Sequence, residues 1–257
     1  MVKISKLKIS LTNISYTKLK FEKFLDIVKI NNLKNIEVAP TLISKNLLKN
    51  PNKIKEILKE KKIKIISLQS LFYKSKKINN KKKNITYLTN HMKKIVNFCF
   101  YLNIKNISLG SCPSRNLKID KKELLKFNLI LFSKFADIAK KKDVKINIEP
   151  ISHKYGNLFL NNAYEVLDFI KKIKKNNIKL VLDTGNCKSE KKNFQTIFLD
   201  NRKFINHIQI SHKHINKFNI NSVKKELVFL KKNNFKKTIT IEYLSEYGKK
   251  IDQLQHI

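Results

Sequence analysis

Residues 144–183 read VKINIEPISHKYGNLFLNNAYEVLDFIKKIKKNNIKLVLD and contain one strand–helix–strand unit. Val144–Glu149 alternates apolar and polar residues, the period of two that predicts a strand with one polar face. Apolar residues then recur at helical spacing, at Tyr164, Leu167, Ile170 and Ile173. Ile178–Asp183 is a second short apolar run, and it ends in an acid. Two strands joined by a helix with short linkers predict neighbouring parallel strands.

The same unit recurs along the whole chain of 257 residues. Eight strands are predicted, at Leu7–Ser10, Asn35–Val38, Lys62–Gln69, Ile104–Leu109, Val144–Glu149, Ile178–Asp183, Ile205–Ser211 and Lys237–Glu242. Helices are predicted near 18–31, 44–60, 86–102, 121–141, 162–175, 189–199 and 221–234, with Asp120 and either Asn161 or Asn162 as caps. Eight repeats predict an α/β fold closed into a (β/α)8 TIM barrel, with 1–257 as a single domain.

The predicted strands carry polar residues on one face. These are Asn147 and Glu149, then His207, Gln209 and Ser211, then Thr238, Thr240 and Glu242. In a barrel the apolar face meets the helices, so the polar face is expected to line the interior. Barrel enzymes keep their active sites at the carboxyl ends of the strands. We therefore expect a site at that rim.

Residue types that are scarce in this chain gather at the same rim. The four glycines (Gly110, Gly156, Gly185 and Gly248) each follow a predicted strand, as do Pro40, Pro113, Pro150 and one of the two arginines, Arg115. All loops attract Gly and Pro, but the loops from helix to strand carry almost none here. The asymmetry indicates which end of the barrel is functional.

Four oxygen-bearing side chains end four consecutive predicted strands: Glu149, Asp183, Gln209 and Glu242. Their separations of 34, 26 and 33 residues each correspond to about one strand–helix repeat. Three carboxylates that converge on a barrel mouth repel one another unless a cation neutralises them. Carboxylate and amide oxygens suit Mg2+ or Mn2+, so we expect a divalent metal site. The alternative is that one or two of these acids are ordinary helix caps.

Composition gives a weaker signal than these positions. Lys and Arg number 56 against 19 Asp and Glu, for a net charge of +37. Such a charge is compatible with nucleic-acid binding. However, the lysines are scattered along the chain, and AT-rich codons would supply Lys, Asn and Ile whatever the function. We expect solvated lysine faces and no nucleic-acid partner.

Location is expected to be cytoplasmic. No stretch of 18 residues is free of polar breaks, which argues against a membrane span, and the beginning MVKISKLKIS lacks an apolar signal region. The cysteines, Cys99, Cys112 and Cys187, are odd in number and lack metal-site spacing, as expected in a reducing compartment.

Several segments in order along the chain resemble the sugar phosphate isomerase/epimerase family of xylose isomerase-like TIM barrels. They are IEVAPT at 36–41, ISLQSLFY at 66–73, LGSCPSRN at 109–116, IEPISHKYGNLFLNN at 148–162, LDTGN at 182–186, HIQIS at 207–211 and IEY at 241–243. Relatives of this group include ketose 3-epimerases, hydroxypyruvate isomerase and endonuclease IV. The set is specific for the superfamily and not for a substrate.

The resemblance implies that Glu149, Asp183, Gln209 and Glu242 are the metal ligands. Gln209 resembles the hydroxypyruvate-isomerase variant, because ketose 3-epimerases carry a histidine there. The resemblance also implies that Glu149 and Glu242 are the acid/base catalysts, on opposite sides of a small hydroxy-carbonyl substrate. Proton transfer would then pass through an enediolate stabilised by the metal. Relatives often dimerise, which makes a homodimer an expectation.

Other residues are candidates for contact with a carbohydrate substrate: Gln69, Arg115, His153 and His212. For Arg115, an anion anchor and a support of the loop are both open. Glu37 has two open roles as well, a structural ion pair and a substrate contact. His207, one layer below Gln209, is interpreted as a satisfied interior histidine.

The sequence thus predicts a metal-dependent sugar isomerase or epimerase. One alternative is a DNA-repair nuclease similar to endonuclease IV, but Gln69, Ser111, Asn186 and Gln209 stand in the corresponding regions and suit a cluster of zinc ions poorly. The other is a degenerate barrel with a binding role.

Overall fold

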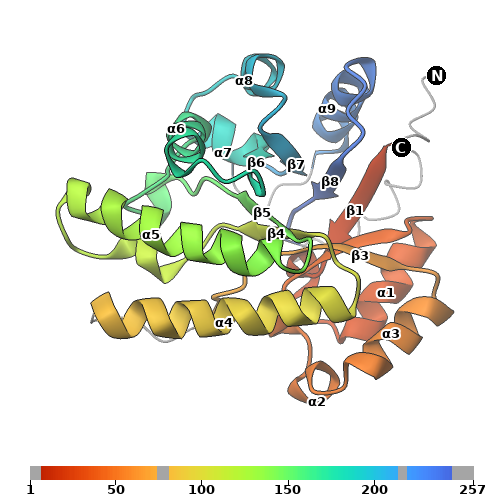
Figure 1. Ribbon diagram of the computed structural model, residues 1–257. Helices are drawn as coiled ribbons and strands as arrows, with labels where there is room; N and C mark the ends of the chain where they lie inside the picture. Colours follow the sequence, from red (N-terminus) through yellow and green to blue (C-terminus); the bar gives the residue numbers. More distant parts are fainter. Residues whose placement is uncertain (1–6, 74–80, 214–218, 245–257) are drawn as a thin grey trace.

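The computed structural model describes residues 7–73, 81–213 and 219–244. Within these ranges, parallel strands β1 to β8 pair in sequence order and close into one barrel (Figure 1). The strands are β1 (Lys8–Thr12), β2 (Asn35–Val38), β3 (Lys64–Leu68), β4 (Asn106–Leu109), β5 (Lys145–Ile148), β6 (Ile178–Asp183), β7 (Ile205–Ile210) and β8 (Thr238–Ile241). The predicted (β/α)8 barrel is confirmed.

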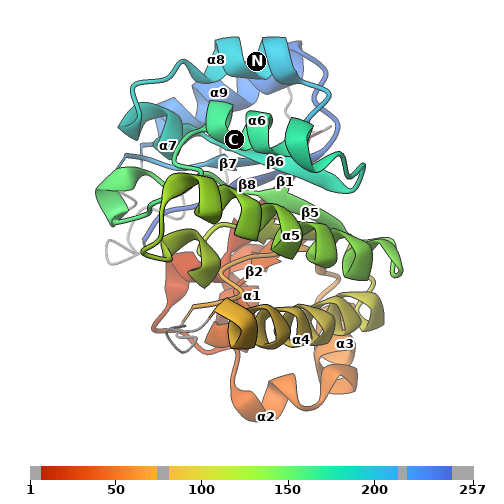
Figure 2. The ribbon, with the colours of Figure 1, turned by 60° about the vertical axis from the view of Figure 1, so that its left-hand side comes forward.

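Helices surround the barrel, and α4 runs alongside α5 on one flank (Figures 1 and 2). They are α1 (Phe21–Ile30), α2 (Lys45–Leu48), α3 (Pro51–Glu60), α4 (Lys81–Tyr101), α5 (Lys121–Lys140), α6 (Ala163–Ile173), α7 (Thr184–Ser189), α8 (Phe194–Asn201) and α9 (Ile220–Lys232). Asp120 caps α5 by accepting from Lys122 N and Glu123 N, and Asn162, the second of the two predicted candidates, caps α6.

Two helices differ from the sequence-based prediction. A single helix over 44–60 is wrong, because Pro51 begins α3 and lacks the N–H that would continue α2. Asn50 caps the new start by accepting from Lys53 N at 3.1 Å. The short helix α7 was not predicted; it begins directly after Asp183, which is its N-cap.

The hydrophobic core lies between the strands and the helices. Outward-facing strand residues such as Ile146, Leu180 and Ile208 have no exposed surface. Phe132 and Phe135 of α5 are also fully buried and belong to the same cluster. Burying one such aliphatic side chain stabilises the fold by roughly 1.5–3 kcal/mol. The barrel is therefore held mainly by this outer layer.

The barrel interior is polar, as the strand alternation predicts. Ser10 and Thr240 exchange a hydrogen bond at 2.8 Å between β1 and β8. His207 Nδ1 lies 2.6 Å from Thr238 Oγ1, which confirms it as a satisfied interior histidine. These hydrogen bonds join neighbouring strands of the barrel through its polar interior.

The carboxyl ends of several strands continue into short 3-10 turns. They are Asn13–Tyr16 after β1, Pro40–Leu42 after β2, Pro113–Asn116 after β4 and His153–Tyr155 after β5. Gly156 ends the last of these with φ +74°, a left-handed conformation that favours glycine. Gly248 lies outside the described residues. No described helix has the length and apolarity that a bilayer span requires.

Candidate active site

A cavity of about 290 Å³ lies at the rim formed by the carboxyl ends of the strands. This volume is close to the lower limit of about 300 Å³ for small-molecule sites. Three carboxylates line it: Glu149 after β5, Asp183 at the end of β6, and Glu242 after β8. Five serines also line it: Ser70, Ser111, Ser152, Ser189 and Ser211. The rim identified from the scarce residues is therefore the one that is hollowed.

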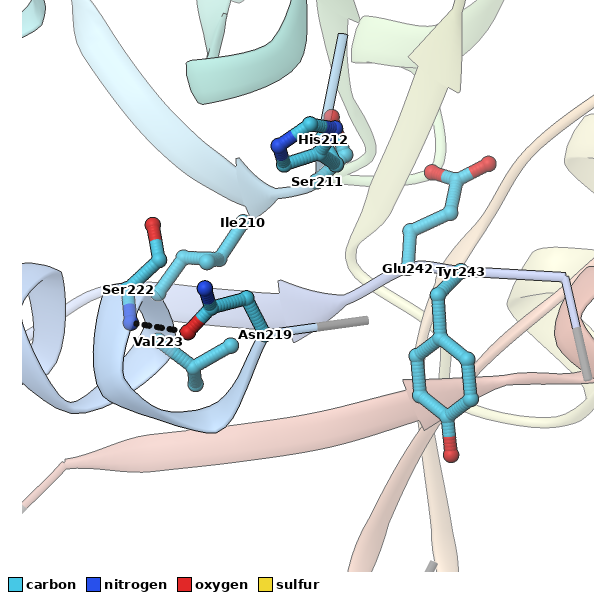
Figure 3. A pocket seen from close by; sticks show the side chains of 8 residues that line it. All are labelled: Ile210, Ser211, His212, Asn219, Ser222, Val223, Glu242 and Tyr243. Atoms are coloured by element: carbon cyan, nitrogen blue, oxygen red, sulfur yellow. Dashed lines mark hydrogen bonds between the residues drawn. The ribbon is translucent and has the colours of Figure 1, made fainter. Parts of the chain in front are cut away.

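The barrel backbone positions the two glutamates. Glu149 N donates to Leu109 O at 3.1 Å, and Glu242 N donates to Ile210 O at 3.0 Å. Both residues thus stay in the ladder of parallel strands one position beyond β5 and β8. Figure 3 shows that the Glu242 side chain and that of the next residue, Tyr243, point in opposite directions. Tyr243 instead belongs to the hydrophobic core, and its hydroxyl lies 2.8 Å from Tyr16 Oη.

Asp183 is a helix cap, which is the alternative that the sequence left open for one or two of these acids. Its carboxylate caps α7 by accepting from Asn186 N, and it accepts from Ser211 Oγ at 2.8 Å and 3.1 Å. Burial raises the pKa of Asp183 to about 6, although the N–H of Asn186 and the hydroxyl of Ser211 act against that rise. Asp183 therefore lines the cavity while it also starts a helix.

Each glutamate has a perturbed pKa for a shared reason. Burial raises the pKa of Glu149 to about 8, and the charges of Asp183 and Glu37 add to the rise. Burial also raises the pKa of Glu242 well above its usual range, with Glu149 and Asp183 contributing. Carboxyls that repel one another in one cavity do not ionise independently. Without a bound cation, the site therefore holds protons up to a higher pH than ordinary carboxyl groups do.

Gln209, on β7, is fully buried and lies in register with Asp183 of β6. Its Nε2 donates to Glu37 Oε2 at 3.3 Å and to Gln69 Oε1 at 3.2 Å. Its Oε1 is buried and has no hydrogen-bond partner among the described residues. Gln209 is thus near the carboxylates in register, opposite Asp183, without lining the cavity itself.

Glu37 is a buried ion-pair partner, the first of the two roles predicted for it. Its Oε2 lies 3.3 Å from His207 Nε2, and its Oε1 accepts from Ser108 Oγ at 2.6 Å. Burial by itself would raise the pKa of Glu37, but the neighbouring His207 and the serine donors hold it at about 2. Glu37 is accordingly ionised beneath the cavity.

The donor chemistry fits a hard divalent cation on two observations. Three buried carboxylates line one cavity, and the buried amide oxygen of Gln209, in register with one of them, is unpaired. Considering the described part of the chain, no three His, Cys, Asp or Glu side chains are arranged to hold a metal ion by themselves. A metal site at this cavity would therefore need a donor besides those side chains, and the unpaired Gln209 Oε1 is one such oxygen.

Of the predicted substrate contacts, the structure brings Gln69 and His212 to the cavity wall. Arg115 is fully buried and instead donates to four backbone carbonyls, those of Gly110, Glu149, Phe159 and Leu160. These contacts favour the loop-support role over the anion anchor. His153 does not line the cavity; its side chain is 63% exposed and pairs with Glu190 at 2.9 Å.

Sequence reasoning missed part of the wall. Ile14, Tyr155 and Ser189 line the cavity without having been singled out. Tyr155 lies within the family-like segment 148–162, which was a usable signal, whereas Ile14 offered none. Asn186 was noted only as a departure from the family, yet its buried Oδ1 faces no partner in the described structure. This oxygen adds a further acceptor at the wall.

Several solved structures share the fold. The IolI protein with a bound zinc atom has a TM-score of 0.77 at 18% identity, over 97% of this chain and 94% of that one. The 3-keto-D-glucoside 4-epimerase from Escherichia coli has a TM-score of 0.78 at 12% identity, over 98% of each chain. An AP endonuclease of family 2 from Brucella melitensis has a TM-score of 0.76 at 11% identity, over 92% and 93%.

Comparison of the sequence with curated proteins gives no match. The family profile described as xylose isomerase-like TIM barrel matches residues 25–255. This range includes seven of the eight barrel strands and every cavity residue except Ile14. The chain therefore belongs to the xylose isomerase-like TIM barrel family.

Proposed function

We propose that this protein is a metal-dependent isomerase or epimerase of a small sugar or related hydroxy-carbonyl compound. The observation that carries the proposal is the pair Glu149 and Glu242. Both carboxyls line one cavity; burial raises the pKa of Glu149 to about 8 and the pKa of Glu242 well above its usual range. A base and an acid that flank a substrate carbon are what proton transfer next to a carbonyl requires.

Repulsion between the two glutamates favours the protonation state that this chemistry needs. The charge of Glu149 adds to the raised pKa of Glu242, so ionising Glu149 disfavours ionising Glu242. One carboxylate is then free to take a proton from carbon while its neighbour holds a proton to return. Glu149 and Glu242 are accordingly assigned as the catalytic residues.

A divalent ion, Mg2+ or Mn2+, would be held by Glu149, Asp183, Gln209 and Glu242. When bound, such an ion polarises a carbonyl and its neighbouring hydroxyl and stabilises the negative charge of an enediolate. Support comes from the unpaired Gln209 Oε1 and from the crowding of the three carboxylates. The ion would also lower the raised pKa values of these acids, because an opposite charge favours their ionised forms.

Contacts to a carbohydrate substrate are assigned to Gln69 and His212 on the cavity wall. The wall serines and the unpaired Asn186 Oδ1 add hydroxyl and carbonyl groups suited to sugar hydroxyls. A volume of about 290 Å³ favours a small ligand. An epimerase among the structures that share the fold supports this substrate class without identifying the compound.

The test is exchange of a carbon-bound proton with solvent. The purified full chain, with Mn2+ or Mg2+, is incubated in deuterated water with a panel of ketoses, tetronates and inositol-like compounds, and deuterium uptake is followed by NMR. We expect uptake next to the carbonyl of at least one compound. Glu149→Gln and Glu242→Gln should each reduce its rate by roughly 10²- to 10⁴-fold.

Glu190→Gln is the matched control. Glu190 lies near the rim on His153 and Ser152 but does not line the cavity, so its loss should leave exchange unchanged. Equal exchange in the wild type and in both cavity variants would contradict the assignment. Full exchange after chelation of divalent ions would contradict the metal dependence.

A further inference from the structure

The Gln209 side chain reaches from β7 to residues of β2 and of the β3 end. Its amide nitrogen donates to Glu37 Oε2 at 3.3 Å and to Gln69 Oε1 at 3.2 Å. A primary amide nitrogen carries two hydrogens, so both donors are used. The amide oxygen, buried and without a partner in the described structure, is its one remaining polar function.

Both neighbours demand the nitrogen rather than the oxygen of Gln209. Glu37 is an ionised carboxylate paired with His207 and already bonded to Ser108, and a carboxylate can only accept. Gln69 directs its own NH2 to Thr12 Oγ1 at 2.6 Å, which leaves its oxygen facing Gln209. If the Gln209 amide were turned over, its oxygen would face two acceptors. The turned orientation is therefore strongly disfavoured.

A buried oxygen without a hydrogen-bond donor or a cation as its partner is unfavourable. The orientation imposed by Glu37 and Gln69 leaves that oxygen without a partner at the β7 position that lies in register with Asp183, one of the carboxylates of the cavity. A hard cation is the partner that suits a carbonyl oxygen among carboxylates. Glu37 itself does not line the cavity, so it acts on a bound cation only through its charge or through the groups that it orients.

We infer that Glu37 is a positioning residue, whose buried carboxylate orients the Gln209 amide so that Oε1 is presented to a divalent cation. The inference rests on the proposed metal site. Gln69 acts in the same way as the second acceptor. The geometry of Gln209 is thus set by strands on the far side of the barrel and not by its own strand.

The first test is Mn2+ affinity of the full chain, measured by electron paramagnetic resonance of free Mn2+. Glu37→Gln keeps the shape but offers either an oxygen or an NH2, so Gln209 is free to turn over. Loss of an outer partner of a metal ligand typically weakens binding by about 10- to 100-fold. We expect a loss in that range. Unchanged affinity would overturn the inference.

A double-mutant cycle separates orientation from the lost charge. Gln209→Ala removes the ligand, so an effect of Glu37→Gln that acts through Gln209 should vanish in that background. A purely electrostatic effect, or general damage to the barrel, would instead appear equally in both backgrounds and would refute the positioning role. Gln69→Leu changes no charge and should also weaken Mn2+ binding only while Gln209 is present. If Glu37→Gln fails to fold, the comparison of Gln69→Leu with and without Gln209 tests the positioning of the amide.

Thr238→Val is the matched control in the same buried layer. It removes a hydroxyl that bonds His207 and does not touch Gln209, so Mn2+ affinity should stay at the wild-type value. An equal loss in Thr238→Val and Glu37→Gln would overturn the inference. The outcome is distinct from failure of the proposed function, because a wild-type chain that binds no Mn2+ refutes the metal site itself. If the wild-type chain binds Mn2+ and the Glu37→Gln and Gln69→Leu variants bind it equally well, only the positioning role is refuted.

Discussion

Replacing Arg115 with lysine distinguishes a structural from a substrate-binding role. The guanidinium is fully buried and donates to Gly110 O and Glu149 O through Nη1, to Leu160 O through Nη2 and to Phe159 O through Nε. These bonds tie the loop after β4 to the loop after β5. A lysine keeps the charge but loses the planar fork that reaches several carbonyls at once.

The magnitude follows from the number of carbonyls left without a donor. A hydrogen bond from a charged group contributes roughly 1.5–3 kcal/mol. If the ammonium group retains two of the four partners, the free energy of unfolding falls by about 3 to 6 kcal/mol by the same measure. That is a large share of a typical total of about 5–15 kcal/mol.

Urea unfolding at constant pH measures the change, and Arg202→Lys is the matched control. Arg202, the other arginine of the chain, is exposed and makes one bond to Asn234 O at 2.9 Å, so its replacement should shift stability by less than about 0.5 kcal/mol. A loss below about 1 kcal/mol for Arg115→Lys, together with a raised KM, would refute the structural role. It would restore the anion anchor as the explanation.

Three further outcomes are expected. In the folded chain Glu149 and Asp183 have pKa values of about 8 and about 6, so they keep protons that the unfolded chain releases at lower pH. Without divalent ions, the free energy of unfolding measured in urea should therefore fall as the pH rises from about 5 to about 8. A rise in that free energy over this range would contradict the raised pKa values. Gly110→Ala would place a methyl group against Glu149 Oε2 and should slow proton exchange by about 100-fold. Gly156 has open space around it but a φ of +74°, so Gly156→Ala should lower the free energy of unfolding by about 1 kcal/mol and leave exchange unchanged. Incision of abasic DNA should be at background level. His212 is the one imidazole among the described cavity residues, and a cluster of zinc ions needs more nitrogen or sulfur ligands. Incision that depends on added metal would refute this prediction.

Local chemistry explains why so much of the fold was predictable. The repeated alternation of short strands and amphipathic helices specifies parallel pairing without knowledge of any contact. Asn35–Val38 and Ile178–Asp183 match β2 and β6 at both ends, because turn-forming or polar residues bound them closely. The helix boundary at Pro51 was missed because the apolar periodicity continues across it. The break comes from the missing N–H of a single proline, which a pattern averaged over many residues does not detect.

The site was predictable only in part. Glu149, Asp183 and Glu242 could be identified because strand periodicity points them inward and barrel closure brings their ends together. Arg115 and His153 belong to irregular loops, where no period relates position to direction. Their partners, the carbonyls of residues 159 and 160 and the Glu190 carboxylate, are distant in sequence and became known only from the packed loops.

The sequence by itself determined the barrel, the rim that is hollowed and the acids that line it, because periodicity and strand ends are local properties of a chain. Only the tertiary structure decided what each polar group faces. It turned Arg115 inward onto carbonyls, gave Asp183 a helix to cap, and set the Gln209 amide by acceptors on strands far along the chain. Hydrogen bonds are directional and depend on both partners, so their pattern is fixed only once the barrel has closed.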